Sequence, residues 1–424
     1  MLFQLTIHRT AAMALRMAAV AALALSSVAA QAADSQTELA AAVRAAAADA
    51  APLALRIETF GGLEKVDDVL LGSGPTTGLA VDADGYLLCS AFSLAQQPTS
   101  ILVTLPSGKR VAAHVVARDH ARMLVLLKVN SDEKLPVPVA VPRREMRVGQ
   151  TAVALGRTFD VDQPNLSVGI VSAVNRIWGR AIQTDAKISP ANYGGPLIDL
   201  QGRVLGVLTP MSPQGDGELA GAEWYDSGIG FAVPLADVLE RLPQMKQGHD
   251  LHAGKLGVSL ASADDYAEKI EIAAVLPGSP AAKAGFRKGD RIVGLDGKTL
   301  SLQTHLKHEL GARYAGDTVA IALARGKERI ETIVELVADV PPFDVPFLGV
   351  LPMRDFDAAG VKIRYVYPES PAAQAGLQAG DVIRTWAGQP VADAAALRAQ
   401  LGGGDATVGS RVKLQYDRKG KSTE

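Results

Sequence analysis

The chain has little cysteine, few aromatic side chains and no excess of charge of either sign. Cysteine occurs once, at Cys89, so no disulfide can form within the chain. Only 5% of the 424 residues are aromatic, whereas 41 glycines and 23 prolines favour many turns and short strands. Forty-three basic residues stand against 45 acidic ones, a net charge of −2. Nucleic-acid binders usually carry a basic excess, so the composition does not favour that class of protein.

Long apolar runs are also missing beyond the N-terminus. Arg9 and Arg16 precede a short apolar run, Met17–Leu25. Ala30-Gln31-Ala32 follows this run as a small-x-small cleavage site. This order predicts an export signal, residues 1–32, cleaved after Ala32. An uncleaved anchor is the alternative, although the run is short for a membrane span. Export without disulfides is typical of the bacterial periplasm, which is the location we expect, with no integral membrane segment after cleavage.

The single thiol lies within the apolar run Tyr86-Leu87-Leu88-Cys89, which has the character of a strand. A reactive cysteine needs a neighbouring group that lowers its pKa, and none stands nearby in the sequence. We therefore expect Cys89 to be a small buried apolar residue.

Between residues 53 and 234 the sequence alternates short β-prone runs with turn residues. The runs include Leu79-Ala80-Val81, Tyr86-Leu87-Leu88, Ile101-Leu102-Val103, Val111–Val116 and Leu124–Val129. Turn pairs such as Asp84-Gly85 separate them. Many short strands without intervening helices predict an all-β barrel or sandwich. Leu235–Leu242 predicts a closing helix, and the Ala-rich segment Ala33–Ala51 predicts a short helix or a flexible lead.

The C-terminal part of the chain contains an internal repeat. Leu256-Gly257-Val258 recurs as Leu348-Gly349-Val350, and the run Pro277–Gly285 recurs as Pro368–Gly376 at almost the same shift. Gly-Asp pairs follow both runs at matching positions. A register held over so many positions indicates two homologous domains. We expect them at residues 249–340 and 341–424, with the last strand of the second copy missing, because that copy stops early relative to the first.

Each copy resembles the PDZ domain of bacterial HtrA-type proteins, since Ser-Pro-Ala-x-x-Ala-Gly-(x)3-Gly-Asp occurs in both. Such domains add an extended peptide to a sheet edge and capture its terminal carboxylate with backbone N–H groups. The resemblance implies that the two Leu-Gly-Val turns are the carboxylate loops. Their residues would bind peptide: Leu256, Gly257, Val258, Leu348, Gly349 and Val350. Turns without any ligand are the alternative.

Residues 33–248 resemble the HtrA (Deg) branch of the trypsin-like serine proteases. Four segments carry the resemblance, namely Gly72–Gly74 with Val81–Leu88, Asp119–Val129, Gln183–Leu197 and Ser227–Pro234. They resemble, in order, the strands entering the histidine loop, the aspartate segment, the serine loop and the strand beside the specificity pocket. The resemblance implies a mainly β fold, a trypsin-like double β-barrel followed by two PDZ domains (α+β).

The catalytic residues of that family do not carry over to this chain. The histidine position aligns with Phe92, the aspartate position with Met123 and the serine position with Tyr193. Phe92 has no proton acceptor, Met123 has no charge, and the Tyr193 hydroxyl lies several ångströms farther from the backbone than a serine hydroxyl. The former oxyanion loop comprises Ala191, Asn192 and Gly194, and Ala191 stands where the family has a glycine. We expect no catalytic residues.

Other residues of the barrel region offer weak substitutes for the missing triad. His114 belongs to a strand pattern, whereas His120 lies in a loop three residues before Met123. The sequence offers no general base for Ser90, Ser93 or Ser189. A Ser-Lys pair that uses Lys187 is a weak alternative. The pairs His249 with His252 and His305 with His308 lack further ligands, so we expect no metal and no cofactor.

These observations predict an HtrA-like periplasmic pseudoprotease. Its PDZ domains would bind extended or C-terminal peptides, or unfolded proteins, as a scaffold, holdase or regulator in protein quality control. The family resemblance implies a homotrimer or a mixed oligomer with an active HtrA relative. One alternative is an active serine endopeptidase with a displaced triad. Another makes the barrels a spacer for the PDZ pair.

Overall fold

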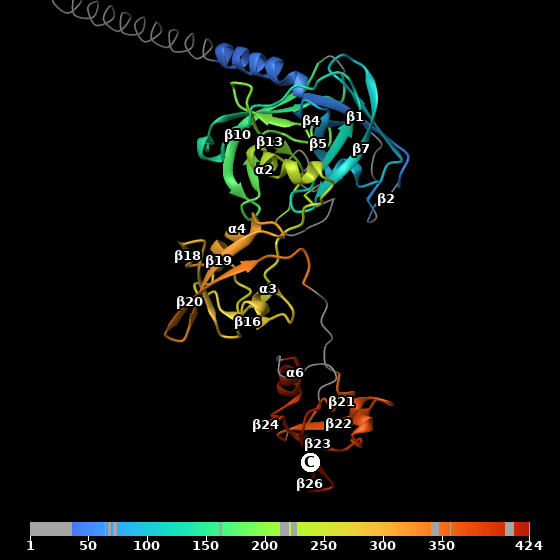
Figure 1. Ribbon diagram of the computed structural model, residues 1–424, viewed down its shortest axis with the longest axis vertical. Coiled ribbons are helices and arrows are strands. Elements are labelled where there is room, and N and C mark those ends of the chain that lie inside the picture. Colours follow the sequence, from blue (N-terminus) through green and yellow to red (C-terminus); the bar gives the residue numbers. More distant parts are fainter. Residues whose placement is uncertain are drawn as a thin grey trace, which may run out of the picture. The chain divides into compact units, whose positions relative to one another are not determined.

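Two closed antiparallel β-barrels form the N-terminal part of the computed structural model (Figure 1). The first closes in the order β1 (Ala54–Phe60), β4 (Thr76–Asp82), β5 (Tyr86–Ser90), β8 (Leu124–Val129), β7 (Arg110–Asp119) and β6 (Ser100–Thr104). Side chains alternate across a strand, so Leu87 and Cys89 face the barrel interior while Leu88 faces the second barrel. The strands predicted from the sequence are present. Where the two barrels meet, these strands are buried on both faces.

The second barrel has the same closure and a different interior. Its order is β10 (Asn165–Arg176), β11 (Ala181–Thr184), β14 (Gly230–Pro234), β13 (Val204–Leu208), β12 (Pro196–Ile198) and β9 (Thr151–Gly156). Small residues such as Ala152 and Ala154 leave room in its core for Tyr193, one of the largest fully buried side chains. The mainly β double-barrel fold predicted from the sequence is confirmed.

Helix α2 (Leu235–Lys246) closes this unit, in agreement with the helix predicted from Leu235–Leu242. It contacts β7 of the first barrel and β13 and β14 of the second. Its Leu235, Val238 and Leu242 join a core shared by both barrels, and so does the helix at residues 36–50, which continues into η1 (Ala51–Leu53). Both helices therefore fasten one barrel to the other by apolar contact.

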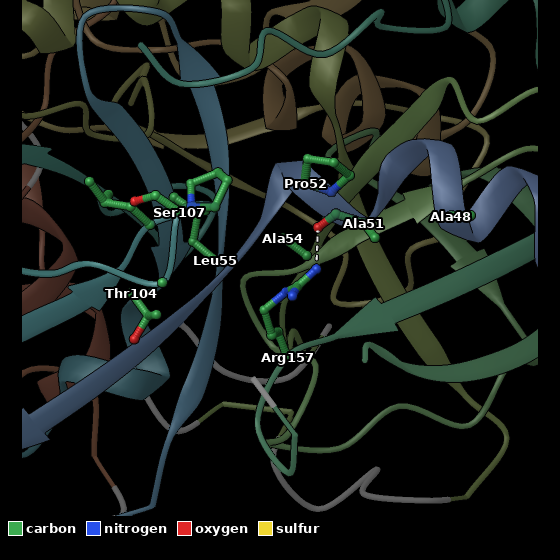
Figure 2. A pocket seen from close by; sticks show the side chains of 11 residues that line it. Ala48, Ala51, Pro52, Ala54, Leu55, Thr104, Ser107 and Arg157 are labelled. Carbon is green, nitrogen blue, oxygen red and sulfur yellow. Dashed lines mark hydrogen bonds between the residues drawn. The ribbon is translucent and has the colours of Figure 1, made fainter. Parts of the chain in front are cut away.

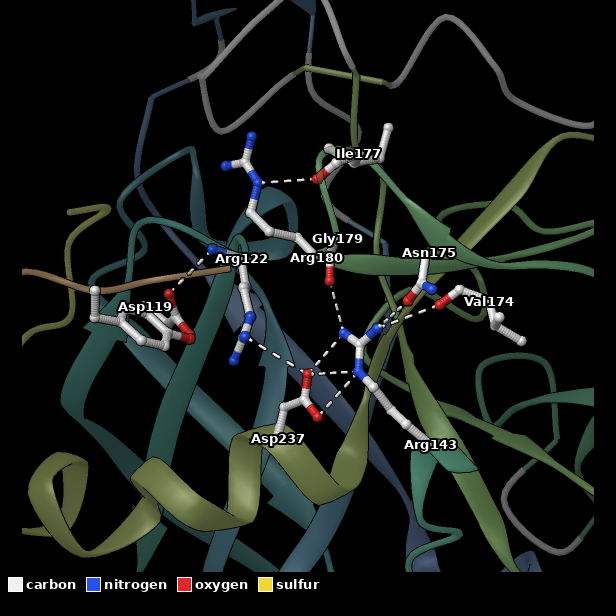
Figure 3. Close-up of polar contacts among 10 residues, drawn as sticks. Asp119, Arg122, Arg143, Val174, Asn175, Ile177, Gly179, Arg180 and Asp237 are labelled. Atoms are coloured by element: carbon white, nitrogen blue, oxygen red, sulfur yellow. Dashed lines mark hydrogen bonds and ion pairs between the residues drawn. The ribbon is translucent and has the colours of Figure 1, made fainter. Parts of the chain in front are cut away.

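A polar cluster reinforces the attachment of α2. Figure 3 shows the Asp237 carboxylate of α2 between two guanidinium groups. It lies 3.6 Å from Arg122, in the turn before β8, and 2.7 Å from Arg143 of η3 (Arg143–Glu145). Arg143 also donates to the carbonyls of Val174 and Gly179. Because all of these groups are partly or fully buried, each charge has a partner, as burial requires.

The structure describes residues 36–63, 65–66, 69–70, 74–160, 163–212, 220–221, 227–340, 347–356, 358–402 and 411–423. The proposed signal segment and Gly72-Ser73 lie outside this set. A short hairpin, β2 (Lys65–Val66) with β3 (Val69–Leu70), leaves the first barrel. No helix within the described ranges has the length and apolarity to cross a membrane. By internal contacts, residues 1–253 and 307–314 form one unit and the remainder a second.

The first PDZ copy follows the pattern of strands and short helices expected from the repeat. Its elements are β15 (Val258–Leu260), β16 (Ile272–Val275), α3 (Pro280–Lys283), β17 (Arg291–Leu295), β18 (Lys298–Thr299), α4 (Gln303–Gly311), β19 (Thr318–Arg325) and β20 (Glu328–Glu335). The repeated Ser-Pro-Ala begins a helix. Ser279 accepts a hydrogen bond from the Ala282 N–H at 3.1 Å, and Pro280 occupies the first helical position.

The second copy repeats these elements and corrects one prediction. It comprises β21 (Val350–Pro352), β22 (Val361–Val366), α5 (Pro371–Gln374), β23 (Val382–Trp386), β24 (Gln389–Pro390), α6 (Ala394–Gly402), β25 (Leu414–Arg418) and β26 (Lys421–Thr423). The last strand, predicted to be missing, is present in short form as β26. A turn at Lys419 and Gly420, both with positive φ, returns the chain so that β26 pairs with β25. Counting residues to the chain end overlooked this tight turn.

The repeated Gly-Asp pair has a structural role in both copies. Asp290 is 1% exposed and forms a two-bond ion pair with Arg325 at 2.7 and 2.8 Å. Asp381 pairs with Arg418 in the same way. The guanidinium of Arg325 lowers the pKa of Asp290 against the opposing effect of burial, and Arg418 does the same for Asp381. The arginines, which are the last residues of β19 and β25, were not recognised as part of the repeat.

These ion pairs predict acid sensitivity of the PDZ copies. The folded pKa of Asp290 lies below the unfolded value of about 3.9, so the pair stabilises the fold above that pH and is lost as the pH falls through the folded pKa. We expect Arg325→Met to lower the unfolding temperature by roughly 5 °C at pH 7, a difference that shrinks toward pH 3. Arg329→Met, which removes an exposed pair, is the matched control. Equal effects of both variants at pH 7 would contradict the assignment.

Candidate functional site

Two of the three substituted triad positions meet in the structure. Phe92, in η2 (Ala91–Leu94), packs edge-to-face on Tyr193, with ring centroids 5.3 Å apart and an interplanar angle of 80°. Tyr193 is 2% exposed and belongs to the core of the second barrel. The aromatic pair thus occupies the seam between the barrels, and its packing is the favourable geometry for two rings.

The third position, Met123, faces a different core. Its side chain is 8% exposed and packs with the interior of the first barrel, while φ is 58°. What it presents to the seam is its carbonyl, which accepts from the Ala91 N–H at 2.8 Å and the Thr209 hydroxyl at 3.3 Å. The structure therefore does not bring Met123 to the Phe92–Tyr193 pair as a side-chain partner.

The former oxyanion loop is closed on itself. In trypsin-like enzymes the hole is formed by the backbone N–H groups of the nucleophile and of the residue two positions earlier. Here the Tyr193 N–H donates to the Ser189 carbonyl at 3.1 Å, and the Ala191 N–H donates to the Ser189 hydroxyl at 3.3 Å. The side-chain oxygen of Asn192 accepts a further hydrogen bond from the Ser189 N–H at 2.7 Å. Both donors that an oxyanion would need are engaged within the turn.

The glycines after Tyr193 are required by close packing. Gly194 has φ 84°, and a Cβ atom there would lie 2.2 Å from the Thr77 carbonyl oxygen. Its N–H donates to the Leu208 carbonyl at 2.6 Å, and the Thr77 hydroxyl donates to the Ala191 carbonyl at 2.8 Å. The Gly-Gly-Pro sequence therefore maintains the loop shape independently of the residue at position 193.

One small cavity lies beside Met123 among the described residues. A cavity of about 10 Å³ is lined by His120, Ala121, Met123, Ile177, Arg180, Met211, Ser212 and Ala220. This volume is about what one water molecule needs. This cavity is too small for a substrate side chain.

The alternative residues are held in other interactions. His120 stacks on His252, with ring centroids 4.6 Å apart, and lies 3.6 Å from the Asp250 carboxylate. Ser90 is fully buried and shares a 2.9 Å hydrogen bond with Thr209, while Ser93 shares one of 2.9 Å with Thr76. His114 is exposed on β7, as the strand pattern predicts. None of these contacts aims an imidazole at a serine hydroxyl.

The prediction for the thiol has a simple structural counterpart. Cys89 is fully buried, and burial raises the pKa of its thiol to about 12, so it stays protonated and unreactive. The prediction of a small buried residue is confirmed. Within the described ranges, no three His, Cys, Asp or Glu side chains are grouped so that they could hold a metal ion.

A larger pocket of about 340 Å³ lies beside the end of the N-terminal helix (Figure 2). It is lined by Ala48, Ala51, Pro52, Ala54, Leu55, Thr104, Leu105, Pro106, Ser107, Gly108 and Arg157. The Arg157 guanidinium donates to the Ala51 carbonyl at 2.7 Å. None of the predicted catalytic positions lines this pocket, and its lining offers no carboxylate or imidazole for acid-base chemistry.

The two predicted carboxylate loops have the same construction. Gly257 has φ 82° and Gly349 φ 85°, and a Cβ atom on either would lie within about 2.2 Å of the helix-capping serine, Ser279 or Ser370. Each glycine carbonyl accepts a backbone N–H at 2.9 Å, from Leu276 in the first copy and from the matching residue in the second. The loops are thus fixed in position by the repeated Ser-Pro-Ala helix start.

The strands that follow these loops lie at sheet edges. Among the described residues, β15 pairs only with β16, and β21 pairs only with β22. Leu348 and Val350 pack toward the core of the second copy. An edge strand next to a fixed loop is the arrangement that peptide addition needs.

One residue of the barrel unit, Asp119, was not recognised from the sequence. It is 1% exposed, and one carboxylate oxygen accepts from the Ala121 and Arg122 N–H groups at 3.0 Å each. The other accepts from the Tyr314 hydroxyl at 2.6 Å, and burial raises the pKa of that hydroxyl, which keeps it protonated. Asp119 thereby shapes the turn that leads to Met123. The feature of the sequence that could have indicated this role is the position of an acidic residue at the end of a strand.

Comparison with known proteins decides the family. The trypsin-like peptidase domain profile matches residues 76–207, and the PDZ domain profile matches residues 254–336 and 346–424. A probable periplasmic serine endoprotease, DegP-like, from Hahella chejuensis is 31% identical over 342 residues, which cover 72% of this chain and 70% of that protein. The chain belongs to the HtrA family.

Other HtrA relatives match over a similar span. The periplasmic pH-dependent serine endoprotease DegQ of Escherichia coli is 32% identical over 336 residues, covering 73% of this chain and 71% of the relative. Among solved structures, the HtrA-type protease AlgW with tripeptide matches with a TM-score of 0.55 and 26% identity, covering 70% of this chain and 97% of that one. The HtrA resemblance stated from the sequence is confirmed, while the roles of the individual site residues stay predictions.

The buried phenol of this HtrA chain predicts a stabilising role. We expect Tyr193→Ala to lower the free energy of unfolding by about 3 kcal/mol or more, because a large aromatic side chain is removed from a closed core. Phe159→Ala, at an aromatic residue that is 82% exposed in the same unit, is the control and should change little. Denaturant unfolding measures both. Equal losses would show that Tyr193 does not fill the seam.

Proposed function

We propose that this chain is a periplasmic HtrA-type pseudoprotease that binds peptides through its PDZ copies. The observation that carries the first half is the closed loop at positions 189–195, in which the Ala191 and Tyr193 N–H groups both bond to Ser189. The Phe92–Tyr193 ring contact supports it further, because it fills the seam where substrate would react.

The size of the rate loss expected without a triad favours an absent rather than a weak hydrolytic activity. Loss of the nucleophile or base in a Ser-His-Asp enzyme costs about a million-fold in turnover, and the oxyanion hole and substrate binding supply what remains. In this chain the hole donors are engaged and the space beside Met123 is about 10 Å³. Engagement of the hole donors supports the proposal that little of the remaining rate enhancement is available in this conformation.

A direct test uses the mature chain, a fluorophosphonate probe and a reduced, unfolded protein substrate. We expect neither covalent labelling nor cleavage, while an E. coli DegQ sample processed in parallel gives both. Time-dependent labelling that persists through further purification would support the alternative, an active endopeptidase with a displaced triad. Tyr193→Phe then locates the label, since a probe attached to the phenol oxygen would be lost in that variant.

Peptide binding is supported by the two Leu-Gly-Val loops and their edge strands. Each loop keeps a positive-φ glycine against a helix-capping serine, and each is followed by a strand with one open edge among the described residues. The solved HtrA-type relative AlgW carries a tripeptide according to its description. We propose that extended or C-terminal segments of envelope proteins bind here, which gives the chain a scaffold, holdase or regulatory role in quality control.

Location and assembly complete the proposal. The named relatives are periplasmic, and the export signal predicted at residues 1–32 supports the same location for this chain. We propose a homotrimer or a mixed oligomer with an active HtrA protein. In either assembly an inactive barrel unit would still serve as a structural subunit. Co-purification of a monomer that is free of any HtrA relative would contradict this part.

Glycine variants test the carboxylate loops. We expect Gly349→Ala to weaken binding of a peptide with a free C-terminus by roughly tenfold or more, because the added Cβ would lie 2.1 Å from the Ser370 Cβ. Gly376→Ala is the matched control, since its φ of 79° is similar and no atom lies within 4 Å of an added Cβ. Fluorescence anisotropy measures the affinities. Equal weakening by both variants would argue for a general effect on the fold.

A further inference from the structure

The second PDZ copy carries a set of large apolar side chains on its surface. Phe347 is 63% exposed, Leu351 39%, Tyr365 48% and Tyr367 43%. We call these four residues the aromatic face. Exposed aromatic side chains that lie together, rather than singly, mark interaction sites on soluble proteins.

The four side chains form one continuous set. Leu351 of β21 lies directly opposite Tyr365 of β22, so both point to the same side of the sheet. The rings of Tyr365 and Tyr367 are perpendicular with centroids 5.4 Å apart, and Phe347 lies 5.9 Å from Tyr367. The Tyr367 N–H donates to the Gly349 carbonyl at 2.9 Å, which connects the face to the carboxylate loop.

The fold itself does not require this face. The first copy has the same register, with Ser259 opposite Ala274 where the second has Leu351 opposite Tyr365. The positions of Phe347 and Tyr367 are occupied there by Lys255 and Leu276. Since both copies form the same loop, strands and capping serine, the aromatic face is a property of the second copy alone.

Strand geometry relates the face to a bound peptide. Successive side chains of an extended peptide point to opposite sides, so a peptide added to the open edge of β21 would present two rows. One row would face the side of Val350, which packs toward the core. With the last residue of the peptide on the Val350 side, the other row would face the side of Leu351. That row contains the penultimate residue and the residue two positions before it.

We infer that the aromatic face selects C-terminal peptides with an apolar or aromatic penultimate residue, and that only the second PDZ copy makes this selection. The inference rests on the proposed peptide binding at the carboxylate loop. Contact between that residue and Leu351 is a cross-strand interaction of the kind that stabilises neighbouring strands. Tyr365, one strand farther from the peptide, extends the apolar surface behind Leu351. The face and the loop together define one extended recognition surface.

The experiment uses the full mature chain and fluorescent ten-residue peptides that differ only at the penultimate position. One peptide ends in Phe-Val and the other in Ser-Val, each with a free carboxylate and with an amidated end. We expect the Phe-Val acid to bind about tenfold more tightly than the Ser-Val acid, the sum of two or three cross-strand contacts. Amidation should weaken both.

Exchange variants assign the preference. Leu351→Ser with Tyr365→Ala gives the second copy the residues of the first, and should reduce the roughly tenfold preference for the Phe-Val acid to none. An unfolding curve that matches that of the unsubstituted chain shows that the variant is folded. The reverse exchange, Ser259→Leu with Ala274→Tyr, should add a second site that prefers the Phe-Val acid.

Three results separate the possible failures. Acid-dependent binding that ignores the penultimate residue would overturn this inference and leave the proposed function standing. No acid-dependent binding of any peptide would overturn both. Equal binding of acid and amide, abolished by the Leu351→Ser with Tyr365→Ala exchange, would show that the face binds internal apolar segments, which also contradicts the inference.

Discussion

The hydroxyl of Thr77 ties the two barrels together at the point where a trypsin-like enzyme does its chemistry. It donates to the Ala191 carbonyl and accepts from the Arg157 N–H, each at 2.8 Å, and Thr77 is fully buried. Its own carbonyl leaves room only for glycine at position 194. Because water cannot compete for these bonds, strand β4 fixes the loop whatever residue occupies position 193.

That constraint is compatible with the proposed loss of the reacting atoms from a proteolytic frame. An active site keeps buried charge that must be compensated, whereas here a ring pair and a methionine carbonyl occupy the seam. Replacing a buried ionic group by packed apolar atoms is often neutral or stabilising. The bonds that the Ala191 and Tyr193 N–H groups donate to the hydroxyl and the carbonyl of Ser189 belong to a stable turn, so the fold gains nothing from keeping the hole open.

The two PDZ copies share several buried residues and differ on their surface. Both keep the capping serine, the positive-φ glycine and the buried Asp–Arg pair, which together hold the loop and the sheet. They differ on the outer side of the first strands, where Ser259 in one copy corresponds to Leu351 in the other. Residues buried in both copies are restrained by packing, whereas exposed positions are free to diverge toward different ligands.

The sequence by itself determined the family, the double barrel and the PDZ repeat, because these follow from local patterns and spacing. It predicted that Phe92, Met123 and Tyr193 stand at the triad positions. It also predicted the buried state of Cys89 from its strand. Only the tertiary structure decided that Ser189 takes both hole donors, that Asp119 pairs with Tyr314, and that four scattered apolar residues form one face. Such contacts join residues far apart in the chain, and their distances depend on packing that no local pattern encodes.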